Sequence, residues 1–367
     1  FGSSLWLKPR RPSARRLWPP APATSVMPHA CALDSEELRR ESRRLATLAR
    51  EASAEDTSLE VRGIVWLEHV NIVTGDRRQA EVFYFQGLGL TRDPVRDVGS
   101  TMWANVGPRQ QLHLVDASEG NAAQAVDGSL GLALPDLPAL LRRLASVEPA
   151  LRGTRFAYAD LGHCVVATCP WGNRFFVYPT AAAAAAEAPE RPRKFPRTRM
   201  EEAHAGVDRG MAVRGEAGIR FVQWRCTDAA GAGRFYERIF GCCVRHSEGG
   251  SEAAVCVGPS VHLIFSTAPE PRDAEAVKLA RGVHVCVYIS EFKRVHDALK
   301  DEGLIWTNPR FADLDACDSY EEAVASRQFR FRSIREGKGG KELAELEHEV
   351  RALRHVQFMK HVYYVPK

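Results

Sequence analysis

Two kinds of apolar pattern alternate along most of the chain. Short runs that are apolar or alternate between apolar and polar residues predict strands, and segments with apolar residues three or four positions apart predict amphipathic helices. In order, they give four copies of one unit, a strand, a helix and further strands, which fits a βαβββ module. The expected helices are 77–87, 137–144, 230–240 and 292–301; the expected strands are 64–73, 101–106 and 111–115, then 129–134, 163–168 and 174–178, then 219–226, 254–257 and 261–265, then 283–289, 329–334 and 343–350.

Internal repetition supports the division into modules. The segments 69–87 and 221–241 both carry an aspartate seven residues after the strand position, at Asp76 and Asp228, and a Phe-Tyr pair seven residues later. Gly-Pro turns at 107–108 and 258–259 precede matching strands in the first and third modules. Fixed self-similarity of this kind is the signature of a duplicated architecture.

Three further segments break the modular pattern. Residues 1–33 begin with a basic, proline-rich stretch that contains no acid before Met27, so we expect a disordered or targeting-like tail, or a sequence-end artefact with Met27 as the start. Residues 34–60 should hold a polar N-terminal helix that begins at Asp34 and lies against a domain surface. Residues 181–216 combine six alanines with proline and charge and predict a flexible linker. The modules then form a first domain at 61–180 and a second at 217–367, the latter with an irregular insertion near 308–327.

Composition narrows the class of protein. The 367 residues are 45% hydrophobic and 26% charged with a net charge of +4, as in ordinary globular proteins, so neither nucleic acid nor a membrane is an expected partner. Nine scattered cysteines without zinc spacing point to reduced thiols. We therefore expect a cytoplasmic protein, or an organellar one if the basic tail is a targeting segment.

Several motifs in register resemble the vicinal-oxygen-chelate superfamily, which includes glyoxalase, bleomycin-resistance and extradiol-dioxygenase proteins. The run from His69 to Leu90 is similar to its opening signature, 169–174 (CPWGNR) to its turn before a last strand, and 347–351 (EHEVR) to the last strand of some larger members. The resemblance implies an α+β fold in which tandem βαβββ modules pair into two domains, each a U-shaped mixed sheet with helices outside. It also implies metal ligands that project inward from the first and fourth strands of each module.

Transferred to the first domain, the resemblance gives His69 and His113 as ligands. The corresponding positions in its second module are Leu130 and Phe176, which cannot bind a metal. We therefore expect a degenerate site in the first domain, which then acts mainly as a structural partner.

The second domain offers a fuller ligand set. The first-strand position is Phe221, but Gln223 lies on the same strand face and could replace it; His262, His284 and Glu347 follow, with Glu345 as an alternative acid. Two histidines and a carboxylate suit Fe(II) or Mn(II), with nickel or zinc as alternatives.

The remaining question at the sequence level is whether the chain is an enzyme. The leading interpretation is a metal-dependent enzyme of the glyoxalase or dioxygenase type, monomeric, acting on a small oxygen-rich substrate in the second domain. The alternative is a metal-free protein that binds or sequesters a small molecule. Arg330 and Arg332 could line a pocket for an anionic substrate, or could pair with Glu345 and Glu347 across a hairpin; the second arrangement favours the metal-free alternative.

Overall fold

The structure is a computed structural model, and it describes residues 35–55, 63–94, 101–117, 122–180, 216–268, 274–310 and 312–358. The predicted tail at 1–33, with Met27, and the predicted linker up to residue 215 lie outside these ranges. In the described part of the chain, no helix is long and apolar enough to cross a membrane.

The first module contains β1 (Ile64–Thr74), α2 (Arg77–Ala80), the π-helical turn η1 (Glu81–Gly87), β2 (Thr91–Arg92), β3 (Thr101–Gly107) and β4 (Gln110–Asp116). Asp76 caps the helix, because its Oδ1 accepts a hydrogen bond from the Gln79 amide at 2.7 Å. Gly89 then turns the chain with a φ of +74°, which only glycine adopts at little cost. The repeated aspartate and the glycine that follows the helix therefore mark its start and its end.

The other three modules follow the same order. The second contains β5 (Gly128–Leu134), α3 (Leu137–Val147), η2 (Glu148–Leu151), β6 (Ala157–Asp160), β7 (Val165–Thr168) and β8 (Arg174–Pro179). The third contains β9 (Gly218–Cys226), α6 (Ala229–Phe240), β10 (Val244–His246), η4 (Glu248–Gly250), β11 (Glu252–Cys256) and β12 (His262–Thr267). The fourth contains β13 (His284–Ile289), α8 (Phe292–Asp301), α9 (Ala312–Asp315), α10 (Tyr320–Ser326), β14 (Gln328–Arg335) and β15 (Glu342–Ala352), preceded by the short helix α7 (Ala274–Ala280).

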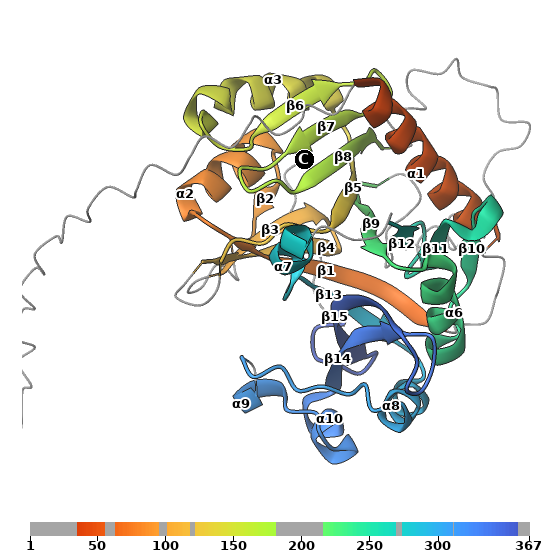
Figure 1. The fold of residues 1–367 in the computed structure, drawn as a ribbon. Helices are drawn as coiled ribbons and strands as arrows, with labels where there is room; N and C mark the ends of the chain where they lie inside the picture. Colours follow the sequence, from red (N-terminus) through yellow and green to blue (C-terminus); the bar gives the residue numbers. More distant parts are fainter. Residues whose placement is uncertain are drawn as a thin grey trace, which may run out of the picture. The chain divides into compact units, whose positions relative to one another are not determined.

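The strands form two mixed sheets, so the predicted α+β fold of paired βαβββ modules is confirmed (Figure 1). The partnership of the modules differs from the expected one. One sheet has the order β14-β15-β13-β1-β4-β3-β2 and joins the first module to the fourth; the other has the order β10-β11-β12-β9-β5-β8-β7-β6 and joins the second to the third. We call these the outer-module sheet and the inner-module sheet.

Two antiparallel strand pairs join the modules in this arrangement. In the outer-module sheet β1 pairs with β13, and in the inner-module sheet β5 pairs with β9. Hydrophobic periodicity predicts which residues form strands, but a first strand can pair equally well with the first strand of any other module. Consecutive pairing, with domains at 61–180 and 217–367, was therefore the wrong arrangement for the two sheets.

Each sheet has one face packed under helices and one opposite face, which we call its inner face. In β1, Val70 and Ile72 belong to the hydrophobic core under the helices, whereas His69 and Asn71 alternate with them and point to the inner face. In β15, His348 lies on the helix side, where its ring stacks on Phe331 with centroids 4.3 Å apart. The three glutamates that alternate with it, Glu345, Glu347 and Glu349, therefore share the inner face.

The N-terminal helix α1 (Ser35–Glu55) covers the inner face of the inner-module sheet, beside β8 and β10 to β12 in Figure 1. The Tyr178 hydroxyl donates to the Ser42 carbonyl at 2.7 Å, and Arg174 pairs with Glu41 at 3.1 Å. Arg44 pairs with Glu252 near the other edge of the sheet. The inner face of this sheet is thus closed by the chain's own helix.

Replacing Leu45 of α1 with alanine should lower the free energy of unfolding by about 2–3 kcal/mol. The side chain is fully buried on the side of the helix that faces the sheet, and its loss leaves a cavity. Thr47, on the exposed side of the same helix, provides the control, and Thr47→Ala should change stability by less than about 0.5 kcal/mol. Urea unfolding measures both, and equal effects would mean that α1 does not dock through Leu45.

Candidate metal centre

The candidate site lies on the inner face of the outer-module sheet. Four strands carry it: β1 and β13 are the first strands of their modules, and β4 and β15 are the last. The register places Asn71 opposite both His113 and His284, and His284 opposite Glu347, so these four residues form one row across the sheet. A second row, two residues along, brings His69 beside Cys286 and Cys286 beside Glu349.

Three histidines meet in this site. The rings of His69 and His113 stack with centroids 3.7 Å apart, and the ring of His284 lies 5.7 Å from that of His69 in an edge-on orientation. The ligand atoms that His69, His284 and Glu349 can offer all lie within 4.8 Å of one another. A single ion could therefore reach donors from both modules.

Burial keeps these imidazoles in the neutral form that metals bind. Loss of solvent lowers the pKa of His69 to about 3. It also lowers the pKa of His113 and of His284 well below the ordinary value, and in His284 the neighbouring Arg330 adds to the effect. All three rings are consequently ready to donate a lone pair at neutral pH.

Glu349 supplies a carboxylate beside His284. Its Oε2 lies 3.6 Å from His284 Nε2 and accepts a hydrogen bond from Arg330 at 2.8 Å, while its Oε1 contacts Arg351. Burial alone would raise the pKa of Glu349, but Arg351 and Arg330 outweigh it and hold that pKa well below the ordinary value. The carboxylate is therefore ionised throughout the neutral range.

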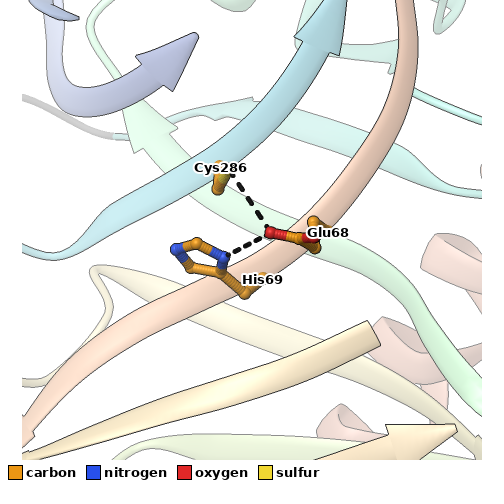
Figure 2. Close-up of side chains that lie close together, drawn as sticks. All are labelled: Glu68, His69 and Cys286. Carbon is orange, nitrogen blue, oxygen red and sulfur yellow. Dashed lines mark hydrogen bonds and ion pairs between the residues drawn. The ribbon is translucent and has the colours of Figure 1, made fainter. Parts of the chain in front are cut away.

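A bulge in β1 adds a second carboxylate. The pairing of β1 with β13 shifts between Leu67 and His69, which turns Glu68 toward the same buried region as its neighbour. Figure 2 shows the Glu68 carboxylate between the His69 ring and the Cys286 thiol, at 3.2 Å and 3.9 Å from Oε2. Arg351 donates to the same oxygen at 2.8 Å, and the Tyr288 hydroxyl donates to Oε1 at 3.1 Å.

Arg330 organises the opposite side of the site. Its guanidinium contacts Asp315 and Glu349 at 2.8 Å and Glu347 at 2.9 Å. Asn308 donates a further hydrogen bond to Glu347 Oε1 at 2.8 Å. Burial raises the pKa of Glu347 and of Asp315 in spite of this contact with Arg330.

The charges of this cluster do not balance. Among the buried residues that the structure describes on this face, Glu68, Asp315, Glu347 and Glu349 carry four negative charges, and only the two arginines Arg330 and Arg351 oppose them. Uncompensated charge in a buried site is costly, so the excess calls for protons or a cation. A divalent ion would neutralise two negative charges, and the nitrogen and oxygen donors present suit iron, manganese, nickel or zinc. The residues therefore fit a divalent metal.

The residues predicted from the sequence are distributed over both sheets. His284 and Glu347 lie together on the outer-module sheet, and so do His69 and His113, which the sequence analysis had assigned to a degenerate site. His262 lies on β12 of the inner-module sheet, opposite Phe221, so it does not share a site with His284. Gln223 is on that sheet too, bonded to Ser129 and Ser266.

The structure also places the remaining candidate residues, Glu345, Arg330 and Arg332. Glu345 is a quarter exposed and lies between Arg281 and Arg332, at 3.5 Å and 3.7 Å. Arg330 is buried in the carboxylate cluster, whereas Arg332 lines a pocket beside His284. The glutamates thus pair with both arginines, which is the arrangement that the sequence analysis attached to a metal-free binder.

The inner-module sheet has no equivalent site among its described residues. Its corresponding row contains Gly131, Phe176, Phe221 and His262. Gly131 occupies the position that spacing had given to Leu130, which lies instead in the core under the helices. The ring of Phe221 fills the space beside this glycine, 2.2 Å from where a Cβ would stand.

Sequence reasoning missed Glu68, Asp315, Glu349 and Arg351. The alternation in 343–350 could have indicated Glu349, since it shares a strand face with Glu347. Arg351 follows the last expected strand, 343–350, so the alternation did not include it. No sequence signal indicates the β1 bulge that turns Glu68 inward, or the fold of the insertion that brings Asp315 to Arg330.

The chain is similar in structure to several known proteins, at low sequence identity. No model of a protein family matches the chain, and no curated protein matches it. Glyoxalase I from Zea mays is similar at 13% identity, over 78% of this chain and 92% of that one, with a TM-score of 0.47. A 2,3-dioxygenase from a Pseudomonas strain is similar at 12% identity over 84% and 96% with a TM-score of 0.28, and an extradiol ring-cleaving dioxygenase from B. fuscum at 13% over 80% and 73% with a TM-score of 0.27.

Proposed function

We propose that this protein is a metal-dependent enzyme that acts on a small, oxygen-rich molecule at the inner face of the outer-module sheet. The observation that carries the proposal is the meeting of His69 and His113 from the first module with His284 and Glu349 from the fourth. These four residues would hold the ion. When bound, a divalent metal would act as a Lewis acid on neighbouring oxygens of the substrate.

The surrounding residues would orient the ligands and handle protons. Glu68 would fix the ring of His69 through Nδ1, and Gln111 would fix the ring of His113, whose Nε2 lies 3.1 Å from its Oε1. Glu347 borders the pocket and has a raised pKa, as a group that exchanges protons near neutral pH requires. Both hydrogen bonds from Asn308 and Arg330 end on its Oε1, so Oε2 would take up and return the proton.

The test is metal content, measured by plasma mass spectrometry on protein purified without chelators and after reconstitution with Fe(II) or Mn(II). We expect close to one equivalent in the unaltered protein. His284→Ala should weaken binding by roughly 100-fold or more, since loss even of an outer partner of a ligand costs 10–100-fold. His262→Ala is the matched control, a buried histidine of the other sheet, and should keep the metal. Loss of metal in this control with retention in His284→Ala would contradict the proposed location.

The second candidate function, a metal-free protein that binds a small molecule, is favoured by the pairing of Glu347 and Glu349 with Arg330. In that case the arginine would take the place of the ion as the partner of the carboxylates. Absence of metal after anaerobic reconstitution, in protein that is folded by circular dichroism, would leave this candidate in place of the enzyme.

A further inference from the structure

A pocket of about 170 Å³ opens beside the candidate metal centre. The buried residues His284 and Glu347 line it, together with Arg281, Arg310, Arg332 and Trp306. An engineered protein cavity of about 150 Å³ holds benzene, so this pocket can hold a molecule of roughly six heavy atoms. An occupant would therefore be small and would lie within reach of the site.

The wall of the pocket is positively charged. Three arginines and two glutamates line it, and one of the two glutamates, Glu347, already accepts a hydrogen bond from the buried Arg330. Glu345 alone lies between Arg281 and Arg332, at 3.5 Å and 3.7 Å, distances longer than a good charge-assisted hydrogen bond. The lining thus favours an anion that could bind these two arginines more closely than Glu345 does.

The arginines are held in place by their surroundings. The Arg332 guanidinium lies 4.7 Å from the centre of the Trp306 ring, a cation–π contact. Gln124 accepts a hydrogen bond from the Val73 amide and donates one to the Arg281 carbonyl at 3.0 Å, which fixes the turn before β13. Gly282 in that turn has a φ of +86°, and a Cβ there would stand 2.9 Å from the amide nitrogen of Gln124. The pocket is therefore built by packed side chains from three parts of the chain.

We propose that this pocket binds the carboxylate of a small organic acid, with the acid's other oxygen-bearing group directed toward His284. The inference rests on the proposed function, because it names the substrate class of the same site. Arg332 and Arg281 bind the carboxylate, and Glu345 competes with it for both of them.

The test uses lactate and its neutral amide, lactamide, which both have six heavy atoms. Calorimetric titration is carried out on the full chain, once loaded with Mn(II) and once freed of metal by chelator and dialysis. We expect lactate to bind the metal-free protein with about millimolar affinity and lactamide to bind at least tenfold more weakly, since a hydrogen bond to a charged group contributes about 1.5–3 kcal/mol. Added salt should weaken lactate binding.

Substitutions separate this role from a general structural one. Arg332→Gln should weaken lactate binding about tenfold or more, whereas Arg335→Gln, on the same strand but outside the pocket lining, should leave it unchanged. Glu345→Gln should tighten lactate binding several-fold, because it removes the competing carboxylate. A loss of packing would give the opposite sign.

The outcomes distinguish the two proposals. Lactate binding that needs Arg332 in protein that never takes up metal would support the pocket and overturn the metal-dependent function. Binding that needs the metal but ignores Arg332→Gln and Glu345→Gln would keep the metal centre and overturn the pocket. No discrimination between lactate and lactamide, with or without metal, would overturn the pocket as well.

Discussion

Replacing Arg330 with methionine should lower the free energy of unfolding by about 3–5 kcal/mol at neutral pH, because it leaves buried carboxylates without their shared partner. The guanidinium contacts Asp315, Glu347 and Glu349, and it is only 3% exposed. Methionine has a comparable length and no charge, so the loss comes from the charges and hydrogen bonds more than from an empty space. Urea unfolding of metal-free protein at pH 7.5 measures the effect.

The pH dependence of this variant shows whether charge is the cause. Without Arg330, the pKa values of Asp315 and Glu347, already raised by burial, should rise further. Protonation at lower pH would then remove the unpaired charges, so the difference from the unaltered protein should shrink as the pH falls from 7.5 toward 5.5. A difference that stays constant over this range would mean that Arg330 acts through packing.

Arg332→Met provides the matched control. Arg332 lies two residues along the same strand, but its side chain is 46% exposed and its carboxylate partner Glu345 is 3.7 Å away. A half-exposed ion pair of this kind contributes about 0–1 kcal/mol. The two arginines that the sequence could not distinguish should therefore differ several-fold in their effect on stability.

The sequence predicted the elements of the fold well and their partnership poorly. The strands, helices and capping residues of all four modules follow from local patterns, such as the Asp76 cap and the Gly89 turn. The pairing of β1 with β13 is a contact between residues more than two hundred positions apart. Local pattern carries no information on such a choice, because all four first strands are apolar enough to be central.

The difference between local pattern and strand pairing also explains which site residues the sequence predicted. The resemblance placed ligands on first and last strands, and His69, His113 and His284 occupy such strands. The error lay in dividing them between two domains, which followed from the assumed pairing of consecutive modules. Glu347 and Glu349 are on one strand face, so spacing alone could not decide which of them approaches the histidines.

Long-range packing determined the remaining features. The bulge that turns Glu68 inward is a shift in strand register, and the contact of Asp315 with Arg330 depends on how the insertion folds. The sequence indicated that the N-terminal helix lies against a domain surface, but not that Leu45 and Leu48 of α1 would bury it against the inner-module sheet. Each of these features involves residues that are distant in the sequence.

The metal-free protein should unfold in acid with a midpoint at about pH 5, because its buried histidines resist protonation. Burial lowers the pKa of His69 and of His348 to about 3 and that of His262 to about 4, whereas a histidine in the unfolded chain titrates near about 6.5. Above pH 6.5 neither state binds the proton, and the shift has no effect on stability. As the pH falls below about 6.5, the histidines bind protons in the unfolded chain but not in the folded protein. Stability is therefore lost until the pH reaches the pKa values that these histidines have in the folded protein.

The expected slope is large. Each such histidine costs about 1.4 kcal/mol per pH unit in this window, or roughly 4 kcal/mol per unit for these three. The raised pKa values of Asp315 and Glu347 act in the opposite sense, since the folded state binds their protons more tightly, but they are fewer. At this rate a typical free energy of unfolding of about 5–15 kcal/mol would fall to zero within a few pH units.

His262→Gln tests the cause, because this residue lies outside the candidate metal centre and only one titratable ring is removed. In urea unfolding at a series of pH values with chelator present, its stability should fall less steeply than that of the unaltered protein, by about 1.4 kcal/mol per pH unit between pH 6 and 4.5. Phe221→Leu, at the position opposite His262 on the neighbouring strand, is the control. It alters the packing of the same face without removing a titratable group, so it should lower stability equally at every pH and leave the slope unchanged. A stability that stays constant between pH 7 and 5 in the unaltered protein would show that the folded chain takes up the same protons as the unfolded chain, so burial would not lower the pKa values of these rings.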